Sequence, residues 1–291
     1  MSHAWLVSII SSATFLLTAV FVVTSAPMQE SAGQTSRPVG PQKIDGHAAE
    51  GLMRSPDTHN AISNNAFVKN LNRLNPNAST PNASNGAASS SLAQATTGYQ
   101  PREEVFLADP SNYGERYKSD PSGQPLSNDY IVVLHETVGS ASSAINTFQT
   151  HHPNDNDQVS YHSLIALDGT VIYVVSPEQR AFGAGNSAFQ TSSGEVETVF
   201  TNPDFPSSVN NFAYHISLET PPDGQNSNAT THSGYTEAQY QSLAWLLART
   251  TVPNERITTH RQVDRSGSRI DPRSFEADRL LALLNQYSSR R

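Results

Sequence analysis

The sequence predicts an α/β fold in which helices flank a central mixed β-sheet. Two observations support this: apolar or alternating runs typical of strands recur after residue 100, and segments with helical periodicity separate them. The strand-like runs are 130–134, 160–167, 170–176, 213–219 and 256–259. The helical segments are 142–150, a stretch between Thr236 and Pro253, and 275–287.

The first elements each have a local signature. Residues 130–134 are continuously apolar, which is typical of a strand buried on both faces. Ala144 and Phe148 lie four residues apart, the spacing of one helix face. The pair Asp168-Gly169 separates the next two runs and predicts a two-residue type I′ hairpin.

The later elements show alternation and capping. Run 213–219 places Ile216 and Leu218 on one face and His215, Ser217 and Glu219 on the other. Thr236 and Gln239 form a capping box, the signature of a helix start. The short strand 256–259 leads directly into His260.

Composition divides the chain into three regions. Residues 1–27 contain an uncharged apolar stretch that ends in small residues before Pro27, which predicts a signal peptide or an N-terminal membrane anchor. Residues 28–100 are rich in Asn, Ser, Ala, Pro and Gly, which predicts a disordered, flexible linker. Residues 101–291 carry the returning aromatic and β-branched residues and are predicted to form one folded domain.

Composition also excludes several classes of function. The 291-residue chain has no cysteine, so disulfide scaffolds, thiol nucleophiles and thiolate metal sites are ruled out. A formal net charge of −8 argues against nucleic acid as a partner. No lysine follows Lys118, which removes lysine-based catalysis from the predicted domain.

Two histidines that follow predicted strands and one aspartate have the chemistry of a catalytic metal site. His135 follows the apolar run at 130–134, His260 follows the strand at 256–259, and Asp271 lies eleven residues further on. Ligands gather where strands end in α/β sheets, and two imidazoles with one carboxylate leave a position open for water. A histidine after a strand is more often a hydrogen-bonded structural residue, so spacing alone leaves both interpretations open.

A series of ordered segments carries a resemblance to a known family. They are IVVLHET (131–137), SYHSLIALDGTVIYVV (160–175), RAFGAGNS (180–187), HISLE (215–219), YTEAQYQSLAWLL (235–247), ITTH (257–260) and RIDP (269–272). Together they resemble the zinc-dependent N-acetylmuramoyl-L-alanine amidases of amidase type 2, the family that includes the peptidoglycan recognition proteins. The resemblance implies a mixed sheet, one Zn²⁺ in a surface groove, and hydrolysis of the amide between N-acetylmuramic acid and L-alanine in peptidoglycan.

The resemblance also implies roles for individual residues. His135, His260 and Asp271 match the zinc ligands. Glu219 matches a carboxylate that shuttles a proton from the attacking water to the leaving amine, although a solvated strand-end carboxylate is the alternative. Tyr161 matches a tyrosine that hydrogen-bonds the water or the oxyanion, although it could equally be a core aromatic. Arg269 stands where many members have lysine and is expected to stabilise the oxyanion.

The sequence departs from the family pattern at other positions. Phe182-Gly183 replaces a common Trp-His pair, His215 stands where small residues are common, and Arg273 replaces a glycine. Arginines also cluster around the second and third ligands, and among them Arg265 and Arg273 are expected to bind the carboxylates of peptide stems. Solvated ion pairs with Asp264 and its neighbours are the alternative.

The leading functional hypothesis is an exported zinc amidase of the cell envelope that takes part in cell-wall turnover. It is expected to act as a monomer on peptidoglycan or muropeptides and to meet the membrane only through its N-terminal segment. A non-catalytic peptidoglycan-binding module of the same fold and a plain envelope-structural domain are the alternatives. Because all three ligand positions are filled, the sequence favours the enzyme.

Overall fold

The computed structural model describes residues 98–287, and its centre is a six-stranded mixed β-sheet in the order β1-β5-β4-β9-β3-β10. The predicted α/β class with a central mixed sheet is therefore confirmed. The apolar segment 1–27 and the linker 28–100 lie outside the described residues, except for residues 98–100. Within residues 98–287, no helix combines the length and the apolar character needed to cross a membrane.

The strands and helices have short, well-defined bounds. The sheet contains β1 (Glu103–Val105), β3 (Ile131–Glu136), β4 (Ser163–Ile165), β5 (Val171–Tyr173), β9 (Ala213–Leu218) and β10 (Ile257–Thr259). Two small antiparallel pairs join β2 (Tyr113–Glu115) to β6 (Gln179–Ala181) and β7 (Phe189–Gln190) to β8 (Val196–Glu197). The helices are α2 (Ala141–Gln149), α3 (Glu237–Ala248), α4 (His260–Val263) and α5 (Ala277–Leu284).

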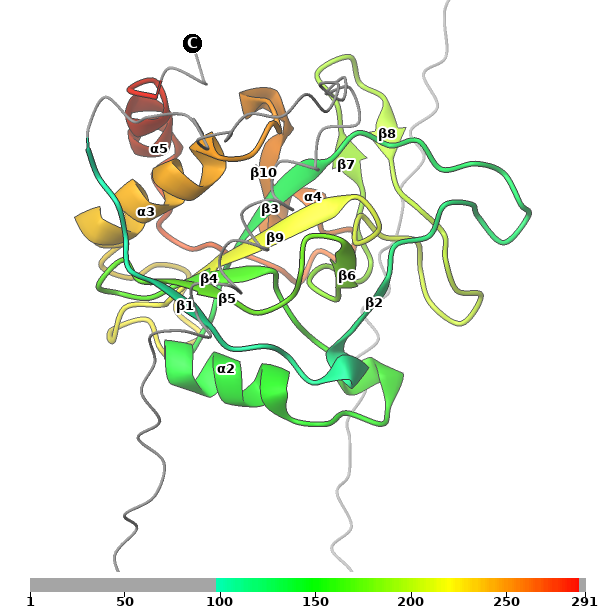
Figure 1. The fold of residues 1–291 in the computed structure, drawn as a ribbon, viewed down its shortest axis with the longest axis horizontal. Helices are drawn as coiled ribbons and strands as arrows, with labels where there is room; N and C mark the ends of the chain where they lie inside the picture. Colours follow the sequence, from blue (N-terminus) through cyan, green and yellow to red (C-terminus); the bar gives the residue numbers. More distant parts are fainter. Residues whose placement is uncertain (1–97, 288–291) are drawn as a thin grey trace, which may run out of the picture. The chain divides into compact units, whose positions relative to one another are not determined.

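Four neighbouring strands of the sheet run in the same direction. β4, β9, β3 and β10 pair in parallel, whereas β5 is antiparallel to β4 and parallel to β1. The carboxyl ends of β9, β3 and β10 therefore meet at one edge of the sheet (Figure 1). This edge is where the sequence places His135 and His260.

Helices cover both faces of the sheet. α3 and α5 pack on one face, over side chains such as Val132, Leu134 and Ile216. α2 packs on the other face against Leu164 and Ile172, and Figure 1 shows it on the side of the sheet away from α3 and α5. The rest of that second face is covered by the segment 184–212 and by α4.

Local signals in the sequence predict the helices better than the turns. The capping box of α3 is confirmed, because the Thr236 hydroxyl accepts from the Gln239 backbone and the Gln239 side chain accepts from the Thr236 backbone. The predicted type I′ hairpin is wrong: β4 and β5 are joined by residues 166–170, and of the central pair only Gly169 has a positive φ. This turn packs against α3, since a Cβ at Gly169 would lie 2.9 Å from the carbonyl oxygen of Ala238.

Candidate metal centre and its pocket

The parallel pairing of β3 and β10 brings the two predicted histidine ligands together. Leu134 and Thr259 are paired in register, so His135 and His260 follow at the same edge of the sheet. His260 is the first residue of α4, which begins with a capping box between Thr259 and Gln262. Asp271 returns to this point because its backbone carbonyl accepts a hydrogen bond of 2.9 Å from the Arg261 backbone.

The three side chains converge with metal-site distances. Nδ1 of His260 lies 3.1 Å from Oδ1 of Asp271, and Nδ1 of His135 lies 3.4 Å from Oδ2 of Asp271. One ligand atom from each of the three residues lies within 4.8 Å of the other two. A tetrahedral metal with ligand bonds of about 2.0–2.1 Å would separate neighbouring ligand atoms by about 3.3 Å, close to the two measured values.

The chemistry of these groups fits a divalent metal ion. Nδ1 of His135 is buried and has no hydrogen-bond partner of acceptable geometry. Burial lowers the pKa of His135 to about 4, so its imidazole is neutral and offers a lone pair. Burial raises the pKa of the Asp271 carboxyl, but the two imidazoles beside it outweigh this and lower the pKa overall. The set therefore offers two imidazole nitrogens and one carboxylate oxygen, which leaves a position open for a reactant.

Tyr161 and Arg269 lie beside the three ligands. The Tyr161 ring stacks on His135 with 4.4 Å between the ring centroids. Burial raises the pKa of the Tyr161 hydroxyl, and the charge of Arg269 only partly opposes it, so the hydroxyl remains a hydrogen-bond donor. The Arg269 side chain is exposed, and its backbone N–H is fixed by Oδ2 of Asp264 at 3.0 Å.

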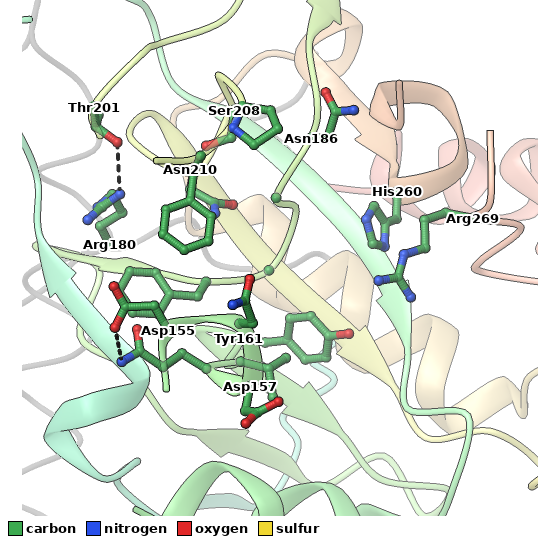
Figure 2. Close-up of a pocket in the computed structure, with 18 of the residues that line it drawn as sticks. Asp155, Asp157, Tyr161, Arg180, Asn186, Thr201, Ser208, Asn210, His260 and Arg269 are labelled. Carbon is green, nitrogen blue, oxygen red and sulfur yellow. Dashed lines mark hydrogen bonds between the residues drawn. The ribbon is translucent and has the colours of Figure 1, made fainter. Parts of the chain in front are cut away.

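A pocket of about 640 Å³ opens in front of these residues. Figure 2 shows His260 and Arg269 on one side of it and Arg180 and Thr201 on the other. Arg180 donates to the Thr201 hydroxyl at 3.2 Å, and its guanidinium lies over the rings of Tyr117 and Phe182. The candidate metal centre is thus one end of a cavity that has an aromatic-lined cation at the other end.

Comparison with known proteins identifies the family. Residues 127–274, about half of the chain, match the family model described as N-acetylmuramoyl-L-alanine amidase. The chain belongs to this amidase family. A search of curated proteins found no match.

Several solved structures are similar to this amidase-family chain. A selenomethionine derivative of AmpD is 24% identical over 63% of this chain and 94% of its own, with a TM-score of 0.42. AmpD of Citrobacter freundii is 23% identical over 64% of this chain and 92% of its own, with a TM-score of 0.40. AmpDh3 of Pseudomonas aeruginosa, solved in complex with an anhydromuramic pentapeptide, is 19% identical over 53% of this chain and 60% of its own, with a TM-score of 0.35.

The structure does not bring Glu219 to the ligands by any contact. Its Oε1 accepts the backbone N–H of Ala141 at 2.9 Å, and its Oε2 accepts the backbone N–H of Leu167 at 2.9 Å. A carboxylate at the first residue of α2 satisfies a free helix N–H and complements the helix dipole. The geometry therefore gives Glu219 a structural role, and its catalytic role stays a prediction without a supporting contact.

Of the two arginines predicted to bind substrate, neither lines the pocket. Arg273 is only 4% exposed, and its guanidinium holds Glu136 with Nε–Oε1 and Nη2–Oε2 distances of 2.6 and 3.2 Å. It also donates to the backbone carbonyls of Gly224, Ser227 and Ala229. Arg273, two residues after Asp271 in the chain, thus connects loop 220–234 to the end of β3. Its guanidinium is not free to bind a substrate carboxylate. Arg265 is exposed and outside the residues that line the pocket.

Sequence reasoning missed the part that His215 plays. The predicted strand 213–219 was expected to have one polar face, but every residue of β9 is buried. His215 is fully buried behind His135, with 2.9 Å between its Nδ1 and Nε2 of His135. Two sequence signals were available: its place on the same face of the sheet as His135, and its departure from the small residues common at this position.

Proposed function

We propose that this chain is a zinc-dependent N-acetylmuramoyl-L-alanine amidase that cleaves the amide between N-acetylmuramic acid and L-alanine in peptidoglycan. The observation that carries the proposal is the convergence of His135, His260 and Asp271 at one end of a large pocket in a member of this family. A donor set of imidazole nitrogens and a carboxylate oxygen, without thiolate, suits a catalytic zinc ion.

The residues around the ligands supply the remaining chemistry. When bound, zinc acts as a Lewis acid toward the scissile carbonyl and the attacking water. The protonated Tyr161 hydroxyl donates a hydrogen bond to the reacting oxygen. The Arg269 guanidinium stabilises the negative charge that develops on the carbonyl oxygen as the carbon becomes tetrahedral. Both residues line the pocket beside the ligands, where a donor and a positive charge can act on the reacting oxygen.

The far end of the pocket suits an anionic peptide stem. Arg180 lies there, and no carboxylate of the described residues 98–287 forms an ion pair with it. Peptide stems carry free carboxylates, and an arginine that lies over aromatic rings can donate two parallel hydrogen bonds to one of them. This end of the pocket would hold the stem while the amide bond lies at the ligands.

The N-terminal sequence supports a place of action outside the cytoplasmic membrane. The uncharged stretch from Ala4 to Ala26 suits a signal peptide or an anchor, and the peptidoglycan substrate lies outside that membrane. Cell fractionation of the full chain, with detection in the envelope or the medium, tests this part of the proposal. Recovery in the cytoplasm alone would contradict it.

The decisive experiment combines metal analysis with product analysis. The purified full-length chain is expected to contain one zinc ion and to release stem peptides from purified cell walls with new L-alanine amino termini. Chelation should stop the release and added zinc should restore it. Mass spectrometry of the soluble products identifies the cleaved bond, and new reducing sugar ends without free stems would overturn the proposal.

One observation favours a second candidate, a peptidoglycan-binding module without catalysis. Glu219 is held by two backbone N–H groups, and the residue of β9 in register with His135 is Ser217, which has no basic group. Without a free carboxylate on β9, the proton of the attacking water would lack the acceptor that the family resemblance predicts. Tight binding of zinc-loaded protein to cell walls, with no release of stems over many hours, would decide for this alternative.

A further inference from the structure

The metal ligand His135 is backed by a second imidazole. Its Nδ1 faces Asp271, and its Nε2 lies 2.9 Å from Nδ1 of His215. Both rings are fully buried, so no bulk water competes for this contact. The orientation of His135 therefore depends on what His215 offers it.

The surrounding hydrogen bonds fix which nitrogen carries each proton. A metal on Nδ1 of His135 requires a lone pair there, so the ring proton lies on Nε2 and is donated to Nδ1 of His215. His215 then carries its own proton on Nε2. Behind it, Nδ1 of His162 accepts the backbone N–H of His215 at 2.9 Å, so Nε2 of His162 donates to the Gln179 carbonyl at 3.1 Å. The three imidazoles form a row, and in this set of tautomers Nη2 of Arg116, which lies 3.2 Å from Nε2 of His162, does not donate to that nitrogen.

The space for the His215 ring is provided by a glycine. A Cβ at Gly183 would lie 2.6 Å from Nδ1 and 2.7 Å from Cγ of His215, closer than real Cβ contacts. The backbone of Gly183 does not have a positive φ, so steric exclusion by this ring accounts for the glycine. Two of the positions where the sequence departs from the family pattern, 183 and 215, therefore face each other directly.

Burial of the His215 ring leaves one of its nitrogens without a hydrogen-bond partner. Nε2 of His215 is buried without a hydrogen-bond partner, as is Oγ of Ser217 two residues later. Unpaired buried donors are unfavourable for folding, so a side chain chosen for stability would be apolar here. The one polar contact that the ring makes is with the metal ligand.

We infer that His215 is a positioning residue of the metal centre: its Nδ1 accepts the Nε2–H of His135 and so holds Nδ1 of His135 toward Asp271 and His260. This inference rests on the metal site of the proposed function and needs no particular substrate. Such outer partners orient ligating histidines and raise their basicity.

Two variants of similar size separate positioning from packing. His215→Asn keeps an acceptor near the position of Nδ1, whereas His215→Leu fills the space without one. In a competition titration of the apoprotein against a chromogenic zinc chelator, His215→Leu is expected to bind zinc about 10–100-fold more weakly than the wild type, with His215→Asn in between. The melting temperature of the His215→Leu apoprotein should equal or exceed that of the wild type. Zinc binding by His215→Leu at wild-type affinity would overturn the inference.

A double variant and a spectroscopic measurement cover the case in which His215→Leu fails to fold. His215→Gly should lose affinity, and Gly183→His combined with His215→Gly should recover it, because the new ring enters the vacated space from the opposite side. Long-range ¹H–¹⁵N correlation spectra of the zinc-loaded wild type should show His215 as the Nε2–H tautomer. An Nδ1–H tautomer would exclude acceptance from His135 and overturn the inference.

The outcomes also separate this inference from the proposed function. Zinc binding with the expected His215 effect but no release of stems would leave the inference standing and reject the amidase. If the wild type releases stems and His215→Leu binds zinc with wild-type affinity, the amidase stands and the inference is rejected. A wild-type chain that binds no divalent metal would reject both.

Discussion

Two consecutive residues of β3 show how differently this fold treats its buried polar groups. Glu136 is paired with Arg273, and its carboxylate also accepts from Thr220 and contacts His232 and the Tyr235 hydroxyl. His135 points to the other face, where His135, His215 and Ser217 supply three of the four unpartnered buried side-chain polar atoms in residues 98–287. Buried polar groups in native proteins are normally satisfied, so the unsatisfied side is the one that we assign to a ligand.

This difference divides the residues near the site into two groups. Those on the Glu136 side hold loop 220–234 and the segment that carries Asp271 in place. Those on the His135 side have buried polar atoms without a hydrogen-bond partner, and among these atoms is Nδ1 of the candidate ligand His135. Substitutions on the first side should affect stability, and substitutions on the second side should affect metal binding and catalysis.

The largest effect is expected from loss of a ligand. His260→Ala should remove zinc from the purified protein and slow stem release by about 10³-fold or more, since metal assistance contributes several kcal/mol to the transition state. Zinc analysis and mass spectrometry of released muropeptides provide the measurement. Arg261→Ala is the matched control, because its side chain is exposed and its backbone N–H to Asp271 is retained. Release of stems by His260→Ala at the wild-type rate would show that the residues on the His135 side do not form the catalytic site.

The next largest effect is expected on stability, from a substitution that removes the hydrogen-bond partner of Glu136. Arg273→Met leaves the Glu136 carboxylate buried without its partner, so the free energy of unfolding should fall by about 3–5 kcal/mol. Urea denaturation followed by circular dichroism measures this value.

The exposed Arg269 provides the contrast. Arg269→Met should change the unfolding free energy by no more than about 0.5 kcal/mol while it slows stem release. A stable Arg273→Met protein with a raised KM would return Arg273 to the substrate-binding role that the sequence suggested.

Local features of the sequence predicted the framework, whereas the three candidate ligands were assigned through the family resemblance. The capping box at Thr236 and Gln239 and the apolar run of β3 are determined by neighbouring residues, and the family resemblance located Asp271. The roles of Glu219 and Arg273 depend on contacts with residues 78 and 137 positions away, so no local pattern reports them. The sequence showed His215 as a residue of an alternating strand and as a departure from the family pattern. Its contact with His135 could not be predicted, because the loop with Gly183 that packs against it comes from another part of the chain.

A smaller effect is expected in the metal-free protein, whose free energy of unfolding should depend on pH. Burial lowers the pKa of His135 to about 4 and the pKa of His162 and His215 well below the ordinary value. These groups favour the folded state above the unfolded pKa of about 6.5, and that stability is lost as the pH falls below it because the unfolded chain takes up the protons.

Each such histidine contributes a slope approaching about 1.4 kcal/mol per pH unit, so the apoprotein should lose stability steeply between pH 6 and 5. Urea denaturation in the presence of chelator at several pH values measures the slope. His215→Leu should lower it by about the contribution of one histidine. A flat profile over this range would mean that the three imidazoles are not buried in their neutral form.

The smallest effect is expected on the KM for the substrate, and it compares Arg180 at the far end of the pocket with the exposed Arg265. Arg180→Leu removes the cation that lies over the rings of Tyr117 and Phe182, so the KM for anionic stems should rise by about 3–10-fold with kcat nearly unchanged. Arg265→Ala is the comparison, and its KM should stay within about 2-fold of the wild type because an exposed side chain makes weak, solvent-screened ion pairs. Steady-state kinetics on a soluble muropeptide and on its stem-amidated form separate charge from packing, since only the charged substrate should respond to Arg180→Leu. A KM that rises for Arg265→Ala and not for Arg180→Leu would move the stem-binding site from the pocket to the surface loop that the arginine pattern first suggested.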